Sequence, residues 1–199
     1  MLAERNGGIR LTEDELQYAE DFLKRVGVAP SDVVIGFHPG CNPEQGNVLR
    51  RWSAEYFAQL GDKLIESFGV KVFVGFGGPE ENSLYQEIHD RMTHKPIIPE
   101  NVAILKTAAL IKRCQLFVAS DSGLMHLASL VKVPTVALYG PIDPVRDAPL
   151  KAKDLVIKAD LPCVPCNTYP HYQYGGSYIR CKYRGAKQGW CMQSISVDE

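Results

Sequence analysis

The chain has 199 residues, of which 45% are hydrophobic and 23% charged, and its formal net charge is -1. This composition is ordinary for a folded globular protein, and the near-neutral charge argues against nucleic acid or an anionic membrane surface as a partner. No apolar run approaches the roughly 18 residues of a transmembrane helix, and the N-terminus lacks the apolar stretch of a secretory signal. We therefore expect a cytoplasmic protein.

Short apolar runs alternate with amphipathic segments along most of the chain. A first helix is predicted over residues 9–26, where Thr12 and Glu15 fit a capping box. Strands are predicted at Val33–Phe37, Val70–Gly75, Leu116–Ala119, Thr135–Leu138 and Asp154–Lys158, and helices at Ala54–Ser67, Glu81–Met92, Leu105–Arg113 and Gly123–Val131. This alternation favours an α/β fold, a Rossmann-like parallel sheet with helices on both faces.

The composition changes after residue 161, where Pro, Gly, Tyr and Cys replace the apolar periodicity. We expect an irregular segment over residues 161–199 that packs on the domain. It holds four of the six cysteines: Cys163, Cys166, Cys181 and Cys191. Three states stay open for them, namely structural zinc, reduced packed thiols and a disulfide formed after purification. Residues 194–199 (SISVDE) have the pattern of a helix start, with Ser196 as its cap, which we interpret as a sign of truncation.

The loop after the first predicted strand, residues 38–42 (HPGCN), contains a Pro-Gly pair that makes a tight exit and exposes backbone N–H groups. A plain strand-ending turn accounts for that pair equally well. Two guanidiniums follow at Arg50 and Arg51, directly before a predicted helix, where forked donors and the helix dipole are suited to phosphate. The alternative for either arginine alone is a solvated basic patch.

A second glycine-rich loop, residues 75–81 (GFGGPEE), lacks the spacing of a dinucleotide or P-loop motif. A carboxylate at the end of such a strand can accept hydrogen bonds from ribose hydroxyls. The alternative is that Glu80 and Glu81 only complement a helix dipole.

The most informative loop is residues 120–126 (SDSGLMH), which ends a buried strand and opens a helix. Backbone N–H groups at such a helix start point outward, and Gly123 lets a pyrophosphate approach closely. A structural alternative makes Asp121 a helix cap and His126 a packed residue. A fourth loop, residues 139–144 (YGPIDP), predicts a rigid turn on the same rim of the sheet.

The order and spacing of these loops resemble glycosyltransferase family 9, the heptosyltransferase-like family of bacterial surface-polysaccharide assembly. The pattern of that family is HPG, Lys-x-Trp, GGP-x-E, D-(S/T)-G-x-x-H and (F/Y)-G-P-(S/T)-x-P. The chain has HPG at 38–40, RRW at 50–52, GGPEE at 77–81, DSGLMH at 121–126 and YGPIDP at 139–144. The resemblance covers roughly residues 10–195, and its specific element is D-(S/T)-G-x-x-H.

The resemblance implies the C-terminal, donor-binding half of a GT-B glycosyltransferase, in which two Rossmann-like domains face each other across a cleft. It implies a nucleotide-diphosphate sugar bound by Gly40, Cys41, Arg50, Glu81, Val102, Asp121, Ser122, Gly123 and His126. Asp121, Ser122, Gly123 and His126 would meet the pyrophosphate, with Gly40 and Cys41 along the phosphate path. Glu81 would hold the ribose, and Val102 would form part of the wall around the base.

Two positions depart from the pattern of the family. Arg50 replaces the family's lysine, which keeps the charge but spreads it over a planar fork. Ile142 stands where Ser or Thr is usual, so a hydroxyl contact is lost there.

We predict an interdomain helix or linker at residues 1–30, a Rossmann-like nucleotide-sugar domain at 31–160 and the Cys-rich segment at 161–199. In the family an acceptor-binding domain comes first and supplies the general base, and here that N-terminal domain is missing. We therefore assign no catalytic residue and expect this chain alone to be inactive.

The full-length reaction implied is attack of an acceptor hydroxyl on the anomeric carbon of an ADP-heptose-like donor. The acceptor is a lipopolysaccharide or another surface glycan, which would place the enzyme in the cytoplasm, at the cytoplasmic face of the inner membrane. No metal cofactor is required, because Arg50 and the helix-start amides can neutralise the pyrophosphate.

Three other functions stay open. One is a stand-alone nucleotide-binding module without transferase activity, and another is a different GT-B enzyme that uses a UDP-sugar. The third is a hydrolase built on Asp121, Ser122 and His126, although the chain has no G-x-S-x-G turn.

Overall fold

The computed structural model describes residues 8–42, 48–149, 154–166, 181–183 and 185–198. Within them, five strands form one parallel sheet in the order β2-β1-β3-β4-β5. The strands are β1 (Val34–His38), β2 (Lys71–Val74), β3 (Leu116–Ser120), β4 (Thr135–Tyr139) and β5 (Leu155–Lys158). The prediction of an α/β fold with a parallel sheet is confirmed, and the predicted strand ends shift by about one residue.

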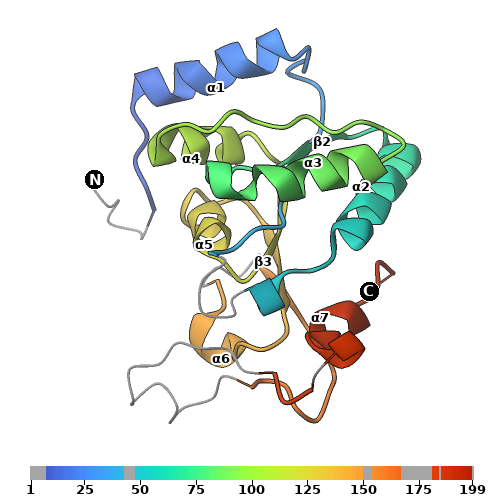
Figure 1. Cartoon of the computed structure of the whole chain (residues 1–199). Coiled ribbons are helices and arrows are strands. Elements are labelled where there is room, and N and C mark those ends of the chain that lie inside the picture. Colours follow the sequence, from blue (N-terminus) through green and yellow to red (C-terminus); the bar gives the residue numbers. More distant parts are fainter. Residues whose placement is uncertain (1–7, 43–47, 150–153, 167–180, 184, 199) are drawn as a thin grey trace.

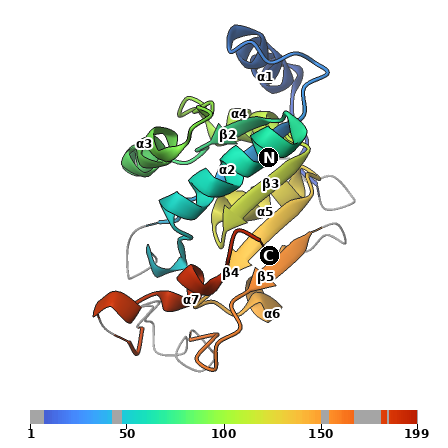
Figure 2. The ribbon, with the colours of Figure 1, turned by 90° about the vertical axis from the view of Figure 1, so that its right-hand side faces the viewer.

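Helices cover both faces of this sheet (Figures 1 and 2). They are α1 (Glu13–Arg25), α2 (Ala54–Phe68), α3 (Asn82–Arg91), α4 (Ile104–Lys112), α5 (Gly123–Leu130), α6 (Pro144–Asp147) and α7 (Trp190–Ser194), with 3-10 turns η2 (Pro79–Glu81) and η4 (Gly185–Lys187). None of the helices in the described part of the chain has the length and apolar character needed to span a membrane.

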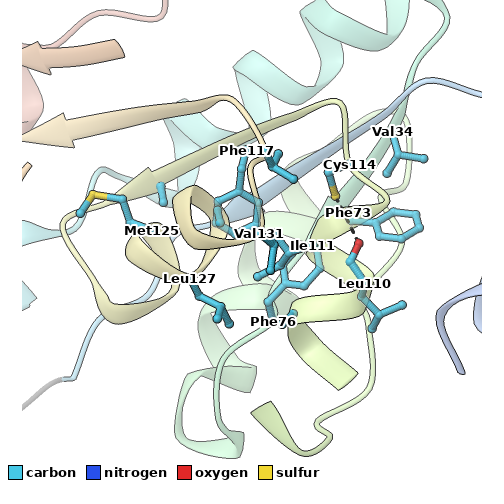
Figure 3. Close-up of a cluster of buried hydrophobic side chains, with 14 of the residues drawn as sticks. Val34, Phe73, Phe76, Leu110, Ile111, Cys114, Phe117, Met125, Leu127 and Val131 are labelled. Atoms are coloured by element: carbon cyan, nitrogen blue, oxygen red, sulfur yellow. Dashed lines mark hydrogen bonds between the residues drawn. The ribbon is translucent and has the colours of Figure 1, made fainter. Parts of the chain in front are cut away.

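The face covered by α1, α4 and α5 is built around aromatic rings from the strands and their ends (Figure 3). Phe76 packs edge-on against Phe117, with ring centroids 5.4 Å apart. Phe22 of α1 packs edge-on against Phe73, at 5.9 Å. The helix that we predicted as an interdomain linker therefore contributes to this core.

The first helix starts later than predicted. It begins at Glu13 rather than at residue 9, because Thr12 is its N-cap and the Thr12 N–H donates to the Glu15 carboxylate at 2.7 Å. Ile9, which we placed inside this helix, instead donates its N–H to the Leu130 carbonyl at 3.4 Å. The capping box thus marks the true helix start, whereas the apolar residues before it pack from an extended segment.

The opposite face is covered by α2 and α3 and by the C-terminal segment. Trp52, just before α2, packs edge-on against Phe57 with ring centroids 5.1 Å apart. The indole N–H of Trp52 donates to the Ile195 carbonyl at 3.0 Å, which ties the C-terminal segment to this face. The prediction that residues 161–199 are irregular is wrong for Trp190–Ser194, which form α7, a helix too short to show periodicity in the sequence.

The predicted rigid turn after β4 packs closely against α7 at Gly140. A Cβ placed on Gly140 would lie 2.6 Å from the Met192 sulfur and 2.8 Å from the Cys191 sulfur. Met192 and Cys191 are both buried, so neither sulfur has free space to retreat into. The Gly140-Pro141 turn and the Cys191-Met192 pair are therefore two sides of one packing contact.

Replacing Gly140 with Ala should destabilise the fold by about 1–3 kcal/mol, because the added methyl overpacks this contact. The free energy of unfolding in urea measures the effect. The matched control is Gly123→Ala, where the added Cβ meets no atom within 4 Å; it should change the free energy by less than about 0.5 kcal/mol. Equal losses in the two variants would contradict the packing account.

Candidate functional site

The strand order creates a switch point between β1 and β3. The chain leaves β1 toward β2 on one side and later returns to β3 on the other side, so the loops at the carboxyl ends of these strands diverge. Ligands of doubly wound α/β folds bind at such a point. A cavity of about 1110 Å³ lies there, and six of the predicted site residues line it: Cys41, Glu81, Val102, Ser122, Gly123 and His126.

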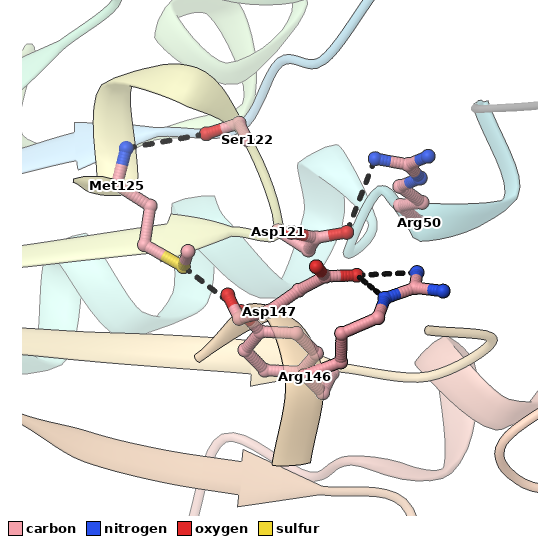
Figure 4. Close-up of polar contacts among 7 residues, drawn as sticks. Arg50, Asp121, Ser122, Met125, Arg146 and Asp147 are labelled. Carbon is pink, nitrogen blue, oxygen red and sulfur yellow. Dashed lines mark hydrogen bonds and ion pairs between the residues drawn. The ribbon is translucent and has the colours of Figure 1, made fainter. Parts of the chain in front are cut away.

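The other three predicted residues, Gly40, Arg50 and Asp121, lie beside the cavity rather than on its wall. Arg50 donates from Nη1 to the Asp121 carboxylate at 3.1 Å (Figure 4), and the Asp121 side chain is almost fully buried. Burial raises the pKa of Asp121, while the Arg50 guanidinium acts to lower it. The fold thus brings Arg50 and Asp121 together as an ion pair at the end of β3.

The exit of β4 contributes further charges next to this pair (Figure 4). Arg146 donates to the Asp147 carboxylate at 2.6 Å, and the Tyr139 hydroxyl donates to the Asp147 carbonyl at 2.6 Å. Asp147 is close enough to Asp121 to add to the rise in the pKa of Asp121. The predicted turn at residues 139–144 therefore continues into α6, a four-residue helix that the sequence analysis did not identify.

The start of α5 has the geometry of an anion site. The Ser122 hydroxyl accepts from the Met125 N–H at 3.4 Å and caps the helix, and the space around Gly123 is open. Free N–H groups and the positive end of the helix dipole favour negative charge here. In the described structure, no hydrogen bond links His126 to Ser122 or Asp121, so the hydrolase alternative lacks its nucleophile–base pair.

Glu81 on the opposite side of the cavity is a buried carboxylate with only 4% of its surface exposed. Its Oε2 accepts from the Tyr85 hydroxyl at 2.6 Å, and its Oε1 lies 3.5 Å from Arg51 Nη2. Gly40 lies directly against it, since a Cβ on Gly40 would come within 2.0 Å of the carboxylate. The alternative that Glu81 only complements a helix dipole does not account for this burial and these two donors.

The sequence analysis did not identify Tyr85 beside this site, and it named Arg51 only as one of two guanidiniums suited to phosphate. Arg51 is indistinguishable by sequence from its neighbour Arg50, and Tyr85 sits at an apolar position of a helical pattern. The signal that could have identified Tyr85 is its spacing of four from Glu81, which places the two side chains on the same side of a helix.

His38, the last residue of β1, also lines the cavity and is 3% exposed. Its Nδ1 lies 2.9 Å from the Gly75 carbonyl, and because a carbonyl only accepts, this nitrogen carries a hydrogen. Burial lowers the pKa of His38, against the nearby charge of Glu81, which acts to raise it. His38 therefore joins the loops after β1 and β2 as a neutral donor.

In the described structure no disulfide joins any of the four clustered cysteines, nor Cys41 or Cys114. Burial raises the pKa of Cys166 to about 11, and Cys163, Cys191 and Cys181 are near enough to add to the effect. Among the described residues, no group of three or more His, Cys, Asp and Glu side chains could hold a metal ion. The described residues thus show neither a disulfide nor a metal-ligand group at this cluster, and which of the three predicted states it adopts stays a prediction.

Taken together, the fold and cavity define a doubly wound α/β domain with its cleft at the switch point. The sequence profile of glycosyltransferase family 9 (heptosyltransferase) matches residues 2–173. The chain belongs to this family.

Relatives agree with this assignment. Lipooligosaccharide heptosyltransferase 2 of Campylobacter jejuni is 30% identical over 137 residues, which are 67% of this chain and 42% of that protein. Lipopolysaccharide heptosyltransferase 2 of Escherichia coli is 30% identical over 155 residues, or 75% of this chain and 42% of that protein. The chain therefore spans less than half the length of these two relatives.

Solved structures match over similar ranges. A family 9 glycosyltransferase of Veillonella parvula matches 96% of this chain with 50% of its own, at 27% identity and a TM-score of 0.74. The ADP-heptose lps heptosyltransferase II of E. coli matches 76% of this chain with 45% of its own, at 29% identity and a TM-score of 0.64. These matches confirm the predicted fold class.

The buried His38 should make stability fall in mild acid. Its folded-state pKa lies below the ordinary value of 6.5, so the unfolded chain binds the proton first. Its contribution is therefore fully present above about pH 6.5 and is lost as the pH falls through the folded-state pKa, with a slope of up to about 1.4 kcal/mol per pH unit. Urea unfolding between pH 7.5 and 5.5 measures this slope.

The slope should become shallower in His38→Gln, whose amide can still donate to the Gly75 carbonyl. The comparison variant is His94→Gln, which removes an exposed histidine that lies 3.4 Å from Glu66 Oε1, and the change in slope should be larger in His38→Gln. A slope that is equally steep in His38→Gln and the unmodified protein would show that His38 is not buried as a neutral ring.

Proposed function

We propose that this chain is the donor-binding half of a glycosyltransferase that uses a nucleotide-diphosphate sugar of the ADP-heptose type. The observation that carries the proposal is one cavity with a buried carboxylate, Glu81, on one side and the open start of α5 at Ser122 and Gly123 on the other. The E. coli structure described as an ADP-heptose lps heptosyltransferase II supports this choice of donor, at 29% identity.

In this proposal each part of the donor contacts residues of matching chemistry. The pyrophosphate lies at the N–H groups that open α5, with His126 beside it and Arg50 within reach as a further donor. The ribose hydroxyls meet Glu81, and the base lies near Val102. Gly40 and Cys41 lie along the phosphates of the donor, between the ribose and the start of α5. Arg50 and the α5 amides then stabilise the charge on the leaving nucleotide diphosphate.

Sugar transfer also needs an acceptor site and a general base. We assign both to an acceptor-binding domain that precedes the three predicted parts of this chain, residues 1–30, 31–160 and 161–199. The proposed reaction is attack of an acceptor hydroxyl on the anomeric carbon of the donor, with a lipopolysaccharide or other surface glycan as acceptor. Its proposed place is the cytoplasmic side of the inner membrane, and this chain without that domain is expected to be inactive.

Calorimetric titration with ADP, UDP, GDP and ADP-heptose tests the donor site. Nucleotides of one base should bind saturably, and we expect that base to be adenine. Arg50→Gln should weaken this binding by about tenfold or more, because a charged donor to phosphate is lost. The control is Arg91→Gln, since Arg91 pairs with Glu87 on the exposed side of α3. Binding that is unchanged in Arg50→Gln, or no binding by any of the four, would contradict the proposal.

Nucleotide binding should also be independent of divalent metal. Arg50 and the start of α5 can neutralise the diphosphate without an ion. The dissociation constant for ADP, measured after chelator treatment and again with added magnesium, should therefore stay within about twofold, a difference that is small on the scale of a charged hydrogen bond. A loss of binding in chelator that magnesium or zinc restores would show that a metal belongs to the site.

A further inference from the structure

The carboxylate of Glu81 is held from behind by residues that do not line the cavity. Arg51 Nη2 donates to the Cys41 carbonyl at 2.7 Å and lies 3.5 Å from Glu81 Oε1. Arg51 is only 22% exposed, so its charge is poorly screened. The guanidinium thus fixes Glu81 relative to the loop after β1.

The second carboxylate oxygen is held by a chain of hydrogen bonds. The Gly77 N–H donates to the Tyr85 oxygen at 3.0 Å, and the Tyr85 hydroxyl donates to Glu81 Oε2 at 2.6 Å. Burial and the neighbouring Glu81 raise the pKa of Tyr85, so the phenol keeps its proton and acts as a donor. Linked hydrogen bonds of this kind polarise and strengthen one another.

Two glycines leave the carboxylate no room to turn. A Cβ on Gly77 would lie 1.9 Å from Glu81 Oε2, and a Cβ on Gly40 would lie 2.0 Å from Oε1. The carboxylate is therefore packed between the loops after β1 and β2, with one donor on each oxygen.

An ionised carboxylate offers about four lone-pair positions, two on each oxygen. Arg51 and Tyr85 use one position on each oxygen of Glu81. One acceptor position per oxygen then remains for a ligand in the cavity that Glu81 lines. Two adjacent acceptors match the two adjacent hydroxyl donors of a ribose.

We propose that Arg51, together with Tyr85, is a positioning residue that holds Glu81 oriented to accept both ribose hydroxyls, which makes the site selective for ribonucleotides. This inference rests on the proposed nucleotide-binding function. Arg51 and Tyr85 act through Glu81 and do not touch the ligand. Replacing either residue should therefore change the ratio between the affinities for ribonucleotide and deoxyribonucleotide more than the affinity for ADP itself.

The test compares the dissociation constants of ADP, 2′-deoxy-ADP and 3′-deoxy-ADP by calorimetry. The unmodified chain should bind each deoxynucleotide about tenfold more weakly than ADP, since each lacks one hydrogen bond to a charged acceptor. In Arg51→Gln, and likewise in Glu81→Gln, these ratios should fall toward one. Arg51→Lys should restore part of the discrimination, because the charge returns without the fork.

A double variant separates positioning from general damage. The double variant Arg51→Gln/Glu81→Gln should show the same ratios of deoxynucleotide to ADP dissociation constants as Glu81→Gln alone. The reason is that the two changes disrupt the same interaction, the one between Glu81 and the ribose. Tyr85→Phe keeps the ring but removes the donor, so it should lower the ratio for one of the two deoxynucleotides and gives an independent reading if Arg51→Gln fails to fold. Arg91→Gln should leave all ratios unchanged.

The outcomes distinguish this inference from the proposed function. If ADP binds but the deoxynucleotides bind equally well, or if Arg51→Gln and Tyr85→Phe weaken all three ligands by the same factor, the positioning role is overturned and nucleotide binding stands. If no nucleotide binds the unmodified chain, the proposed function fails and this inference fails with it.

Discussion

Parallel pairing of β1 with β3, in the register that sets His38 opposite Ala119, brings together two loops that are distant in the sequence. Phe37 is buried on the α2 face and Phe117 on the opposite face, so a slip of one residue would turn a phenylalanine to the wrong side. Gly36 permits the close approach, since a Cβ there would lie 2.7 Å from the Phe117 ring. The core packing of these two strands therefore fixes the geometry of the cavity at their ends.

Arg50 and Arg51 place two positive charges beside the cavity, and each pairs with a different carboxylate. Arg50 pairs with Asp121 from the loop after β3, and Arg51 pairs with Glu81 from the loop after β2. Two neighbouring residues thus hold carboxylates that belong to opposite sides of the switch point. Buried ion pairs of this kind add little to stability, but they are costly to break by removing one partner. We therefore propose that these pairs serve to orient the two carboxylates for binding.

Much of the fold follows from local pattern, because strands buried on both faces are continuous apolar runs and their covering helices are amphipathic. The sequence pattern also located the loops after β1, β2 and β3 that line the cavity, and the turn after β4 beside them. It missed α6 and α7, which are too short to show a period. It also could not assign Arg50 and Arg51 to different carboxylates, because that depends on where each guanidinium points in three dimensions. Tyr85 lies on the buried side of α3, and the sequence gives no sign of its hydroxyl contact with Glu81.

The central claim is that one nucleotide bridges the two sides of the switch point. An amide NMR titration of the chain with ADP tests it most directly, because it reports each loop separately. The account predicts that the amides of Ser122 and Gly123 shift together with those of Gly77 and Glu81, with one common dissociation constant. The amides of β5 and α7 should stay unchanged. Shifts confined to one of the two loops, or shifts centred on β5 and α7, would contradict the account.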